Sequence, residues 1–252
     1  MRKLTCLSVL PALALLFVAS KCGPLNEPEV APAVFIHIAP KCNGKDLVLN
    51  TLTYINAAGD TFSVKTLNYY ISNIKLKRSS DGFTWAEPKS YHLINGSGEH
   101  VININNVPAT GFDELAFSVG VDSSANHKLD NPGDLDPANG MAWDWNTGYK
   151  FFVMEGSRLS KGQTKTFTYH VGTDANYRTL SFPFSALQAG KYIKTEHNQT
   201  AHLLLDAEAD EIFKSPNLIH LEKTNNVMNN PATTDSLANN YASGMFRLTE
   251  IH

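Results

Sequence analysis

The stretch Asn68-Tyr69-Tyr70-Ile71-Ser72-Asn73-Ile74-Lys75-Leu76 decides the fold class. It is rich in aromatic and β-branched residues, and its end alternates, with Ile74 and Leu76 on one face and Lys75 on the other. An alternation with a period of two residues predicts a β-strand with one buried face. The chain around it is therefore expected to be built from sheets.

Outward from this stretch, short apolar runs separated by turn residues recur along the chain. Further strands are expected at 34–38, 47–49, 51–55, 61–64, 91–94, 101–104, 114–121, 149–155, 164–171, 180–184 and 201–207. Helices are expected only at 209–214 and 235–245, the second with Thr234 or Asp235 as its N-cap. This pattern predicts an all-β chain, an antiparallel β-sandwich with long loops and one or two short helices.

The composition fits one folded domain and excludes several other classes of protein. The 252 residues are 42% hydrophobic and 18% charged, which supports one sizeable core and excludes a disordered chain. Three cysteines are too few for a disulfide scaffold. A net charge of -3 gives no basic surface of the kind that nucleic acids require, so no nucleic-acid partner is expected.

The N-terminus has the features of an export signal. A basic start is followed by an apolar run over 7–19, which is too short to span a bilayer comfortably, and small residues allow cleavage after Ser20. The alternative is a lipoprotein signal in which Cys22 is acylated and attaches the protein to a membrane. Export predicts a location in the periplasm or cell envelope, with or without the lipid.

Three segments follow from this interpretation: a signal peptide over 1–20, a proline-containing tether over 21–33 and one domain over 34–252. After cleavage, two cysteines remain in an oxidising compartment. Cys22 and Cys42 are able to pair if neither is acylated, and Cys42 is left alone if Cys22 carries lipid.

A long segment over 122–146 has little strand character, and loops of this length inside a compact domain tend to be functional. Its oxygen-bearing residues Asp134, Asp136 and Asn139 are able to hold calcium, although the spacing is not that of an EF-hand. The alternative is that these side chains cap their own turns. Trp143 and Trp145 are two residues apart, which indicates either a core aromatic patch or a pair of oxidisable indoles.

The sequence around this loop resembles that of a known family. The segment 133–156, GDLDPANGMAWDWNTGYKFFVMEG, is similar to the signature of the MbnP-like family, the methanobactin-associated periplasmic copper proteins. Four other segments are also similar: the strand with His37 followed by 45–50, then 69–76, 169–172 and 240–246. The resemblance covers nearly all of the chain after the export signal.

The resemblance implies an exported β-sandwich that binds copper. It also implies that a tryptophan is oxidised to kynurenine by a partner of the di-haem cytochrome c peroxidase type. The matching tryptophan lies in the pair Trp143 and Trp145, with Trp143 preferred. Kynurenine offers an amine and a ketone as ligand atoms, and two imidazoles beside it favour Cu(I).

Histidines are the expected copper ligands, since imidazole suits copper and an exported site lacks usable thiolates. The candidates are His37, in an apolar strand; His170, at a strand end; His202, at the start of 203–207; and His127, in the long loop. The other five histidines are interpreted as ordinary surface or turn residues: His92, His100, His197, His220 and His252.

Two functional hypotheses follow. The first is a copper-binding protein of the cell envelope that works in copper acquisition or storage. The second is a non-catalytic envelope module whose sandwich binds a protein or a glycan. Enzyme activity is not expected, because no recognisable motif frames Asp144, Glu155 or any serine as a catalytic group.

Overall fold

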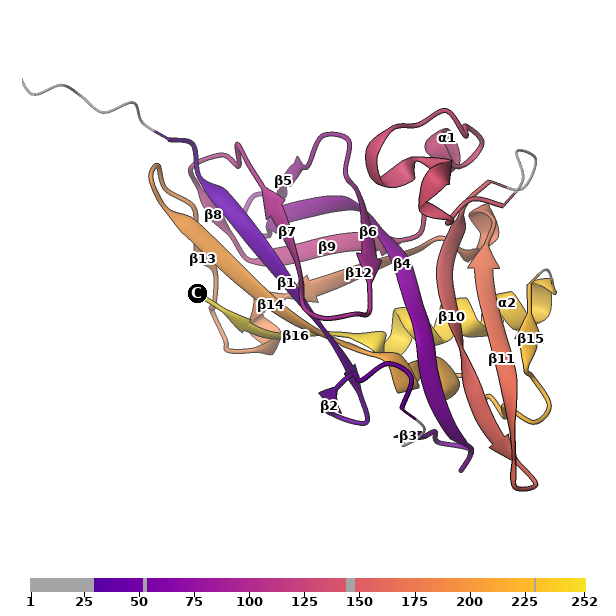
Figure 1. Cartoon of the computed structure of the whole chain (residues 1–252). Helices are drawn as coiled ribbons and strands as arrows, with labels where there is room; N and C mark the ends of the chain where they lie inside the picture. Colours follow the sequence, from indigo (N-terminus) through magenta and orange to yellow (C-terminus); the bar gives the residue numbers. More distant parts are fainter. Residues whose placement is uncertain (1–29, 52–53, 144–147, 229) are drawn as a thin grey trace, which may run out of the picture.

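The computed structural model (Figure 1) describes residues 30–51, 54–143, 148–228 and 230–252. Two large sheets pack against each other and short helices lie at their margin, so the prediction of an all-β sandwich is confirmed. None of the helices in the described part of the chain is long and apolar enough to cross a membrane. The signal peptide, most of the tether, Cys22 and Trp145 lie outside the described residues.

The first sheet has five strands. Its strands are β16 (Phe246–Ile251), β14 (Thr200–Glu208), β1 (Ala33–Cys42) and β2 (Lys45–Asp46) in this order, and β7 (His100–Ile104) also pairs with β1. Residues of β1 and β14 alternate between buried and partly exposed. One face of this sheet therefore packs on the core and the other faces outward.

The second sheet has nine strands around the 18-residue strand β4 (Thr61–Arg78). Its path is β12 (Arg178–Pro183), β9 (Glu114–Val119), β4, β10 (Lys150–Ser160), β11 (Gln163–Gly172) and β15 (Asn226–Val227). Three short strands also pair with β4: β3 (Tyr54–Ile55), β5 (Phe83–Ala86) and β6 (Tyr91–Asn95). A separate pair is formed by β8 (Gly111–Phe112) and β13 (Ile193–Lys194).

The helical segments are short. They are α1 (Ser123–Asn126), α2 (Pro231–Asn240), a π-helical turn (Tyr241–Met245) and the 3-10 turns Gly133–Leu135, Pro137–Asn139, Asp174–Asn176, Phe184–Ala186 and Ala209–Phe213. The helix expected at 235–245 therefore begins earlier. Its N-cap is Asn230, whose side chain accepts from the backbone of Thr233, and neither Thr234 nor Asp235 has this role.

Three details of the strands differ from the expectation. The segment 47–49 is not a strand, and the two expected strands at 61–64 and 68–76 are one continuous strand, β4. The sheets are mixed, because β1 pairs with β14 in parallel, as β11 does with β15. Local alternation identifies a strand but carries no information about its partner, so sequence reasoning has no access to the parallel pairing.

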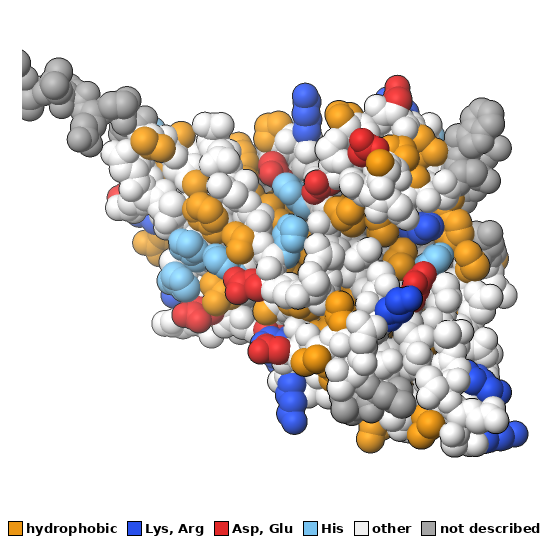
Figure 2. Space-filling view, viewed as in Figure 1, with side chains coloured by type: hydrophobic (Ala, Val, Ile, Leu, Met, Phe, Trp, Pro, Cys, Tyr) orange, Lys and Arg blue, Asp and Glu red, His pale blue; other side chains and the backbone are white. Residues whose placement is uncertain are grey.

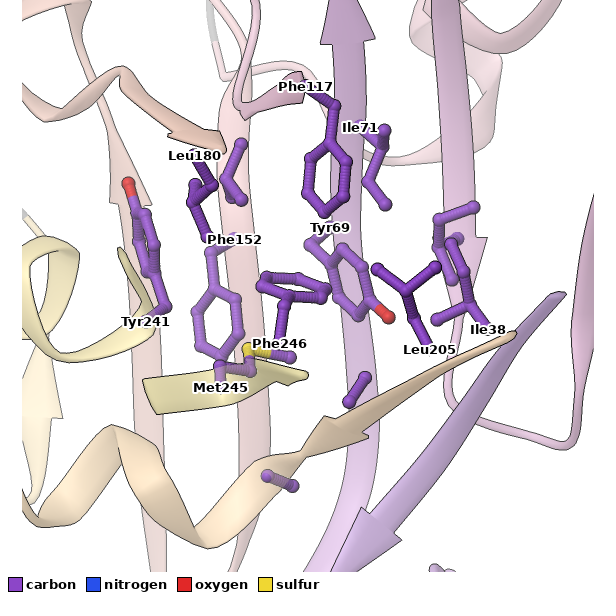
Figure 3. Close-up of a cluster of buried hydrophobic side chains, with 14 of the residues drawn as sticks. Ile38, Tyr69, Ile71, Phe117, Phe152, Leu180, Leu205, Tyr241, Met245 and Phe246 are labelled. Carbon is purple, nitrogen blue, oxygen red and sulfur yellow. The ribbon is translucent and has the colours of Figure 1, made fainter. Parts of the chain in front are cut away.

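The main core lies between the two sheets. Figure 3 shows Ile38 and Leu205 of the five-stranded sheet next to Tyr69 and Ile71 of β4, all of which are buried. The alternation predicted for the end of β4 is also confirmed, since Ile74 and Leu76 are fully buried and Lys75 is exposed.

The described parts of the long loop, 122–143 and 148–149, cover the other face of β4 and β10. Its residues Leu135, Met141 and Tyr149 form a second small core with Tyr70 of β4. The hydroxyl of Tyr70 donates to the backbone oxygen of Asp134 (2.9 Å), and that of Tyr149 donates to the backbone oxygen of Leu135 (2.7 Å). Burial of these aromatic rings holds the described parts of the loop against the sheet.

Asp122 ties this loop to the sheet. Its carboxylate caps α1 at Ser124 and accepts from the side chains of Tyr91 (2.5 Å) and Asn73 (2.9 Å). Partial burial alone would raise the pKa of Asp122, but the hydrogen bonds from Ser124, Tyr91 and Asn73 outweigh it and hold the pKa at about 2.

We expect Asp122→Asn to lower the free energy of unfolding at neutral pH by about 1 to 2 kcal/mol, because an amide replaces an acceptor that faces donors. A lowered pKa in the folded state adds stability above the pKa of the unfolded state, about 4. That contribution is lost as the pH falls from about 4 to about 2. Urea unfolding of both proteins at several pH values measures the effect, and equal stability at neutral pH would contradict it.

Candidate metal centre

Two histidines predicted as ligands meet on the outer face of the five-stranded sheet. The parallel register of β1 and β14 places Phe35 opposite His202 and His37 opposite Leu204. Because Ile36 and Leu203 point into the core, the alternation turns the two histidines outward. Nε2 of His37 lies 2.9 Å from Nδ1 of His202, so the two imidazoles form a direct pair.

A carboxylate orients the ring of His37. Oε1 of Glu99, directly before β7, lies 2.6 Å from Nδ1 of His37. An ionised carboxylate accepts hydrogen bonds and cannot donate, so Nδ1 of His37 carries the hydrogen. In the neutral ring, Nε2 is then the atom with the lone pair, and it faces His202. A carboxylate behind the imidazole is a usual arrangement at metal-binding histidines.

His202 is held between two other rings. Phe35 stacks on it with ring centroids 5.1 Å apart, and His252 does so with centroids 5.4 Å apart. Burial lowers the pKa of His202, and the neighbouring His37 and His252 lower it further. The ring therefore stays neutral to a lower pH than an ordinary histidine, and the neutral imidazole is the form that binds a metal.

Sequence reasoning missed two members of this cluster, Glu99 and His252. The interpretation of His252 as an ordinary surface residue overlooked β16, which brings it beside His202. The signal was present, because Phe246 and Leu248 alternate with polar residues in the segment that forms β16. No local signal identifies Glu99, whose role depends on the pairing of β7 with β1.

His170 and Trp143 form a second and separate group at the start of β10 and the end of β11. Their rings meet edge to face with centroids 5.7 Å apart, and Nε2 of His170 lies 2.7 Å from Oε1 of Glu155. The ammonium of Lys150 lies 5.6 Å from the Trp143 ring. The indole nitrogen of Trp143 and Nδ1 of His170 are buried, and neither has a hydrogen-bond partner among the residues that the structure describes.

The four candidate histidines thus do not form one group. No hydrogen bond or ring contact among the described residues joins His170 or Trp143 to the pair of His37 and His202. His127 lies elsewhere, with its side chain 58% exposed and paired with Asp174 at 3.0 Å. In Figure 2, histidine side chains gather over the end of the five-stranded sheet where β14 and β16 lie, whereas Figure 1 places β10 and β11 at the opposite side of the molecule.

The three residues considered for calcium all make hydrogen bonds within the protein, two of them locally and Asp134 to strand β6. Asp136 accepts from the backbone of Ala138, and Asp134 accepts from the backbone of Leu93. The amide of Asn139 donates to the backbone oxygens of Gly133 and Asp134. The contacts of Asp136 and Asn139 are those of side chains that stabilise their own turns, the alternative that the sequence left open, whereas Asp134 joins the loop to β6.

Cys42 is a poor candidate for a copper ligand. It is fully buried at the end of β1 and makes no disulfide within the described residues. Burial raises the pKa of its thiol, and the nearby Asp210 and Glu208 raise it further, whereas a metal binds the thiolate. Within the described part of the chain, no three side chains of His, Cys, Asp or Glu are already placed to hold a metal together.

The fold and this cluster define a class of protein: a two-sheet β-sandwich that carries an imidazole pair on the outer face of one sheet. A family model for MbnP matches residues 31–230, and the chain belongs to the MbnP family. Among solved structures it is similar to "MbnP from Methylosinus trichosporium", with 16% identity and a TM-score of 0.50 over 74% of this chain and 78% of that one. At this identity the likeness shows the fold. The search of curated proteins finds no match to this chain.

Proposed function

We propose that this chain is an exported copper-binding protein of the bacterial cell envelope, which works in the acquisition or storage of copper. The observation that carries the proposal is the approach of His37 Nε2 to His202 Nδ1 on the outer face of the sheet. Membership of the MbnP family supports it, because copper is the metal that the resemblance to this family implies. The proposed role is non-catalytic.

The pair needs little movement to accept a metal. Bonds from imidazole nitrogens to a metal are about 2 Å long, so a linear bridge requires the two nitrogens to be about 4 Å apart. The observed separation is 2.9 Å, and small rotations of the two side chains supply the difference. His202 then carries its hydrogen on Nε2, which lies 3.4 Å from the Thr200 hydroxyl oxygen.

The proposal favours Cu(I) over harder ions. Two neutral imidazoles make a small donor set, and Cu(I) accepts a low coordination number more readily than ions that need several oxygen ligands. The partial burial of His37, whose side chain is 24% exposed, limits the number of waters that complete the coordination. Glu99 engages Nδ1 of His37 and leaves Nε2 as the nitrogen that faces the metal.

Trp143 lies beside His170, in the second group of side chains. We propose that Trp143 is the residue oxidised to kynurenine, by a partner of the di-haem cytochrome c peroxidase type. Its contact with His170 supports this choice, because opening of the indole would place an amine and a ketone next to an imidazole.

We expect protein from its native host to contain kynurenine at position 143, and protein made without the haem partner to keep the indole. Intact-mass analysis followed by peptide mapping distinguishes the two forms. Unmodified Trp143 and Trp145 in every peptide from the native host would contradict the modification.

Copper content tests the proposed function itself. The protein is purified mildly from the envelope fraction of cells grown with copper, and its metal content is measured. We expect up to one copper per chain, in protein that is lipid-anchored at Cys22 or released. Absence of copper from folded protein, together with failure to take up Cu(I) in vitro, would overturn the proposal.

The alternative function, binding of a protein or glycan partner, has one observation in its favour. A cavity of about 330 Å³ lies beside Trp143 and is lined also by Gly172, Asn176, Met228 and Pro231. An indole that lines a cavity offers an apolar platform to a sugar ring or a side chain. Binding of a partner by copper-free protein would favour this alternative.

A further inference from the structure

A cavity of about 440 Å³ lies beside the small sheet that β8 and β13 form. Its walls come from three places: the end of β4 with the turn after it, β8, and the segment 183–192. In Figure 1, β8 and β13 lie on the side of the molecule opposite to β10 and β11. The described residues that line the cavity include no member of either histidine group, so the cavity is a separate feature.

One wall of the cavity is an exposed aromatic ring. Tyr192, directly before β13, lines the cavity and is 59% exposed. A Cβ atom built at Gly111 of β8 would lie 3.7 Å from Cδ2 of Tyr192, so the ring packs against the glycine backbone. A tyrosine supported in this way offers a flat apolar surface at a low cost in conformational entropy.

Another wall carries a guanidinium whose orientation is fixed. Nε and Nη2 of Arg78 donate to the two carboxylate oxygens of Asp81 (2.9 and 2.8 Å), and Nη1 donates to the hydroxyl of Thr110. The guanidinium carbon lies 5.0 Å from the centroid of the Phe83 ring. A guanidinium has five N–H groups and these contacts use three, so Arg78 keeps donors for a ligand.

A carboxylate in the same cavity is also fixed. The backbone N–H of Ser79 donates to both oxygens of Asp113 (2.9 and 3.1 Å), and the Ser79 hydroxyl donates to Oδ1 (2.9 Å). An ionised carboxylate has about four acceptor sites, so Oδ2 of Asp113 keeps one for a ligand. The cavity therefore presents an oriented donor and an oriented acceptor together with an aromatic ring.

This combination selects the chemistry of the ligand. A sugar hydroxyl both donates and accepts hydrogen bonds, and the C–H face of a pyranose ring is apolar, so an oligosaccharide uses all three groups. The charges at the cavity balance, because Arg78 and Lys191 are matched by Asp113 and by the Asp81 that pairs with Arg78. A balanced site does not attract a polyanion, which favours a neutral ligand.

We propose that this cavity binds a neutral oligosaccharide, with Tyr192 as the stacking surface and Arg78 and Asp113 as the hydrogen-bonding groups. The inference is independent of the proposed metal site, since neither histidine group takes part in it. In a protein of the cell envelope, such a site would hold the chain next to the glycans of the envelope.

Two variants of Tyr192 separate stacking from other effects. Tyr192→Ala removes the ring, whereas Tyr192→Phe keeps it. Leu218→Ala is the control, because Leu218 is 53% exposed and does not line the cavity. Copper-free, isotope-labelled protein is titrated with cellotetraose, maltotetraose and chitotetraose, and with a sulfated heparin tetrasaccharide as the charged probe. Amide shifts in NMR spectra give the affinity and locate the site.

We expect at least one neutral tetrasaccharide to bind, with shifts at β8, β13 and the turn after β4, and with higher affinity than the sulfated one. Tyr192→Ala should weaken this binding about 10-fold or more, the size of effect expected for truncation of an anchoring aromatic residue. Tyr192→Phe and Leu218→Ala should bind within about threefold of the wild type.

Three results would overturn the inference: no binding of any neutral probe, tighter binding of the sulfated probe, or binding that Tyr192→Ala leaves unchanged. Shifts confined to the cavity beside Trp143 would also overturn it and would favour the alternative function. None of these results bears on copper binding, which is measured separately.

Discussion

Replacement of His202 by alanine is expected to weaken Cu(I) binding by more than about 100-fold. His202 supplies one of the two nitrogens of the pair and touches every other ring of the cluster, so its loss leaves His37 without a partner. Loss of a direct ligand should lower the metal affinity by more than the roughly 10- to 100-fold that follows loss of a residue hydrogen-bonded to a ligand. His37→Ala should have a similar effect. Chelator competition at fixed pH measures both affinities.

His170→Ala is the matched control for this experiment. His37 is partly buried and His170 is buried, and each contacts a glutamate. His170, however, lies in the second group beside Trp143. In protein that carries no kynurenine, we expect this variant to bind Cu(I) as the wild type does. Loss of binding in His170→Ala and retention in His202→Ala would move the copper site to the second group.

Substitution of Gly156 by alanine is expected to lower the free energy of unfolding strongly. Gly156 lies in β10 between β4 and β11, at a shift in the register with β4. A Cβ atom built there would lie 1.9 Å from the backbone oxygen of Ser63 and 2.8 Å from the ring of Phe167. A backbone oxygen in a sheet cannot move away without disruption of the pairing, so we expect a loss of about 4 kcal/mol or more, or failure to fold.

Gly98→Ala provides the control for this prediction, because nothing lies within 4 Å of a Cβ atom at that glycine. Its expected effect on the free energy of unfolding is within about 0.5 kcal/mol. Urea unfolding followed by circular dichroism compares the variants. A Gly156→Ala protein as stable as the wild type would contradict the register between β4 and β10.

The fold could be predicted from the sequence to the extent that it depends on local patterns. The alternation at Ile74, Lys75 and Leu76 predicts both the strand and its buried face. The two cores follow less directly, because the segment over 122–149 has no regular period in the sequence and its described residues pack through contacts such as that between Tyr70 and Tyr149. Contacts of this kind join residues far apart in the sequence, and no local pattern reports them.

The site could be predicted only in part, for the same reason. His37 and His202 are candidates by residue type and by their strands, but they are 165 positions apart, and only the parallel pairing of β1 with β14 brings them together. His252 was missed because its strand was not expected. The tryptophans lie in the loop that packs on the nine-stranded sheet, whereas the imidazole pair lies on the five-stranded sheet.

A crystal structure of the protein loaded with Cu(I), with anomalous diffraction measured on both sides of the copper absorption edge, tests the central claim most directly. The account predicts one strong anomalous peak between Nε2 of His37 and Nδ1 of His202, about 2 Å from each. A peak beside His170 and Trp143 instead, or none on the outer face of β1 and β14, would contradict it.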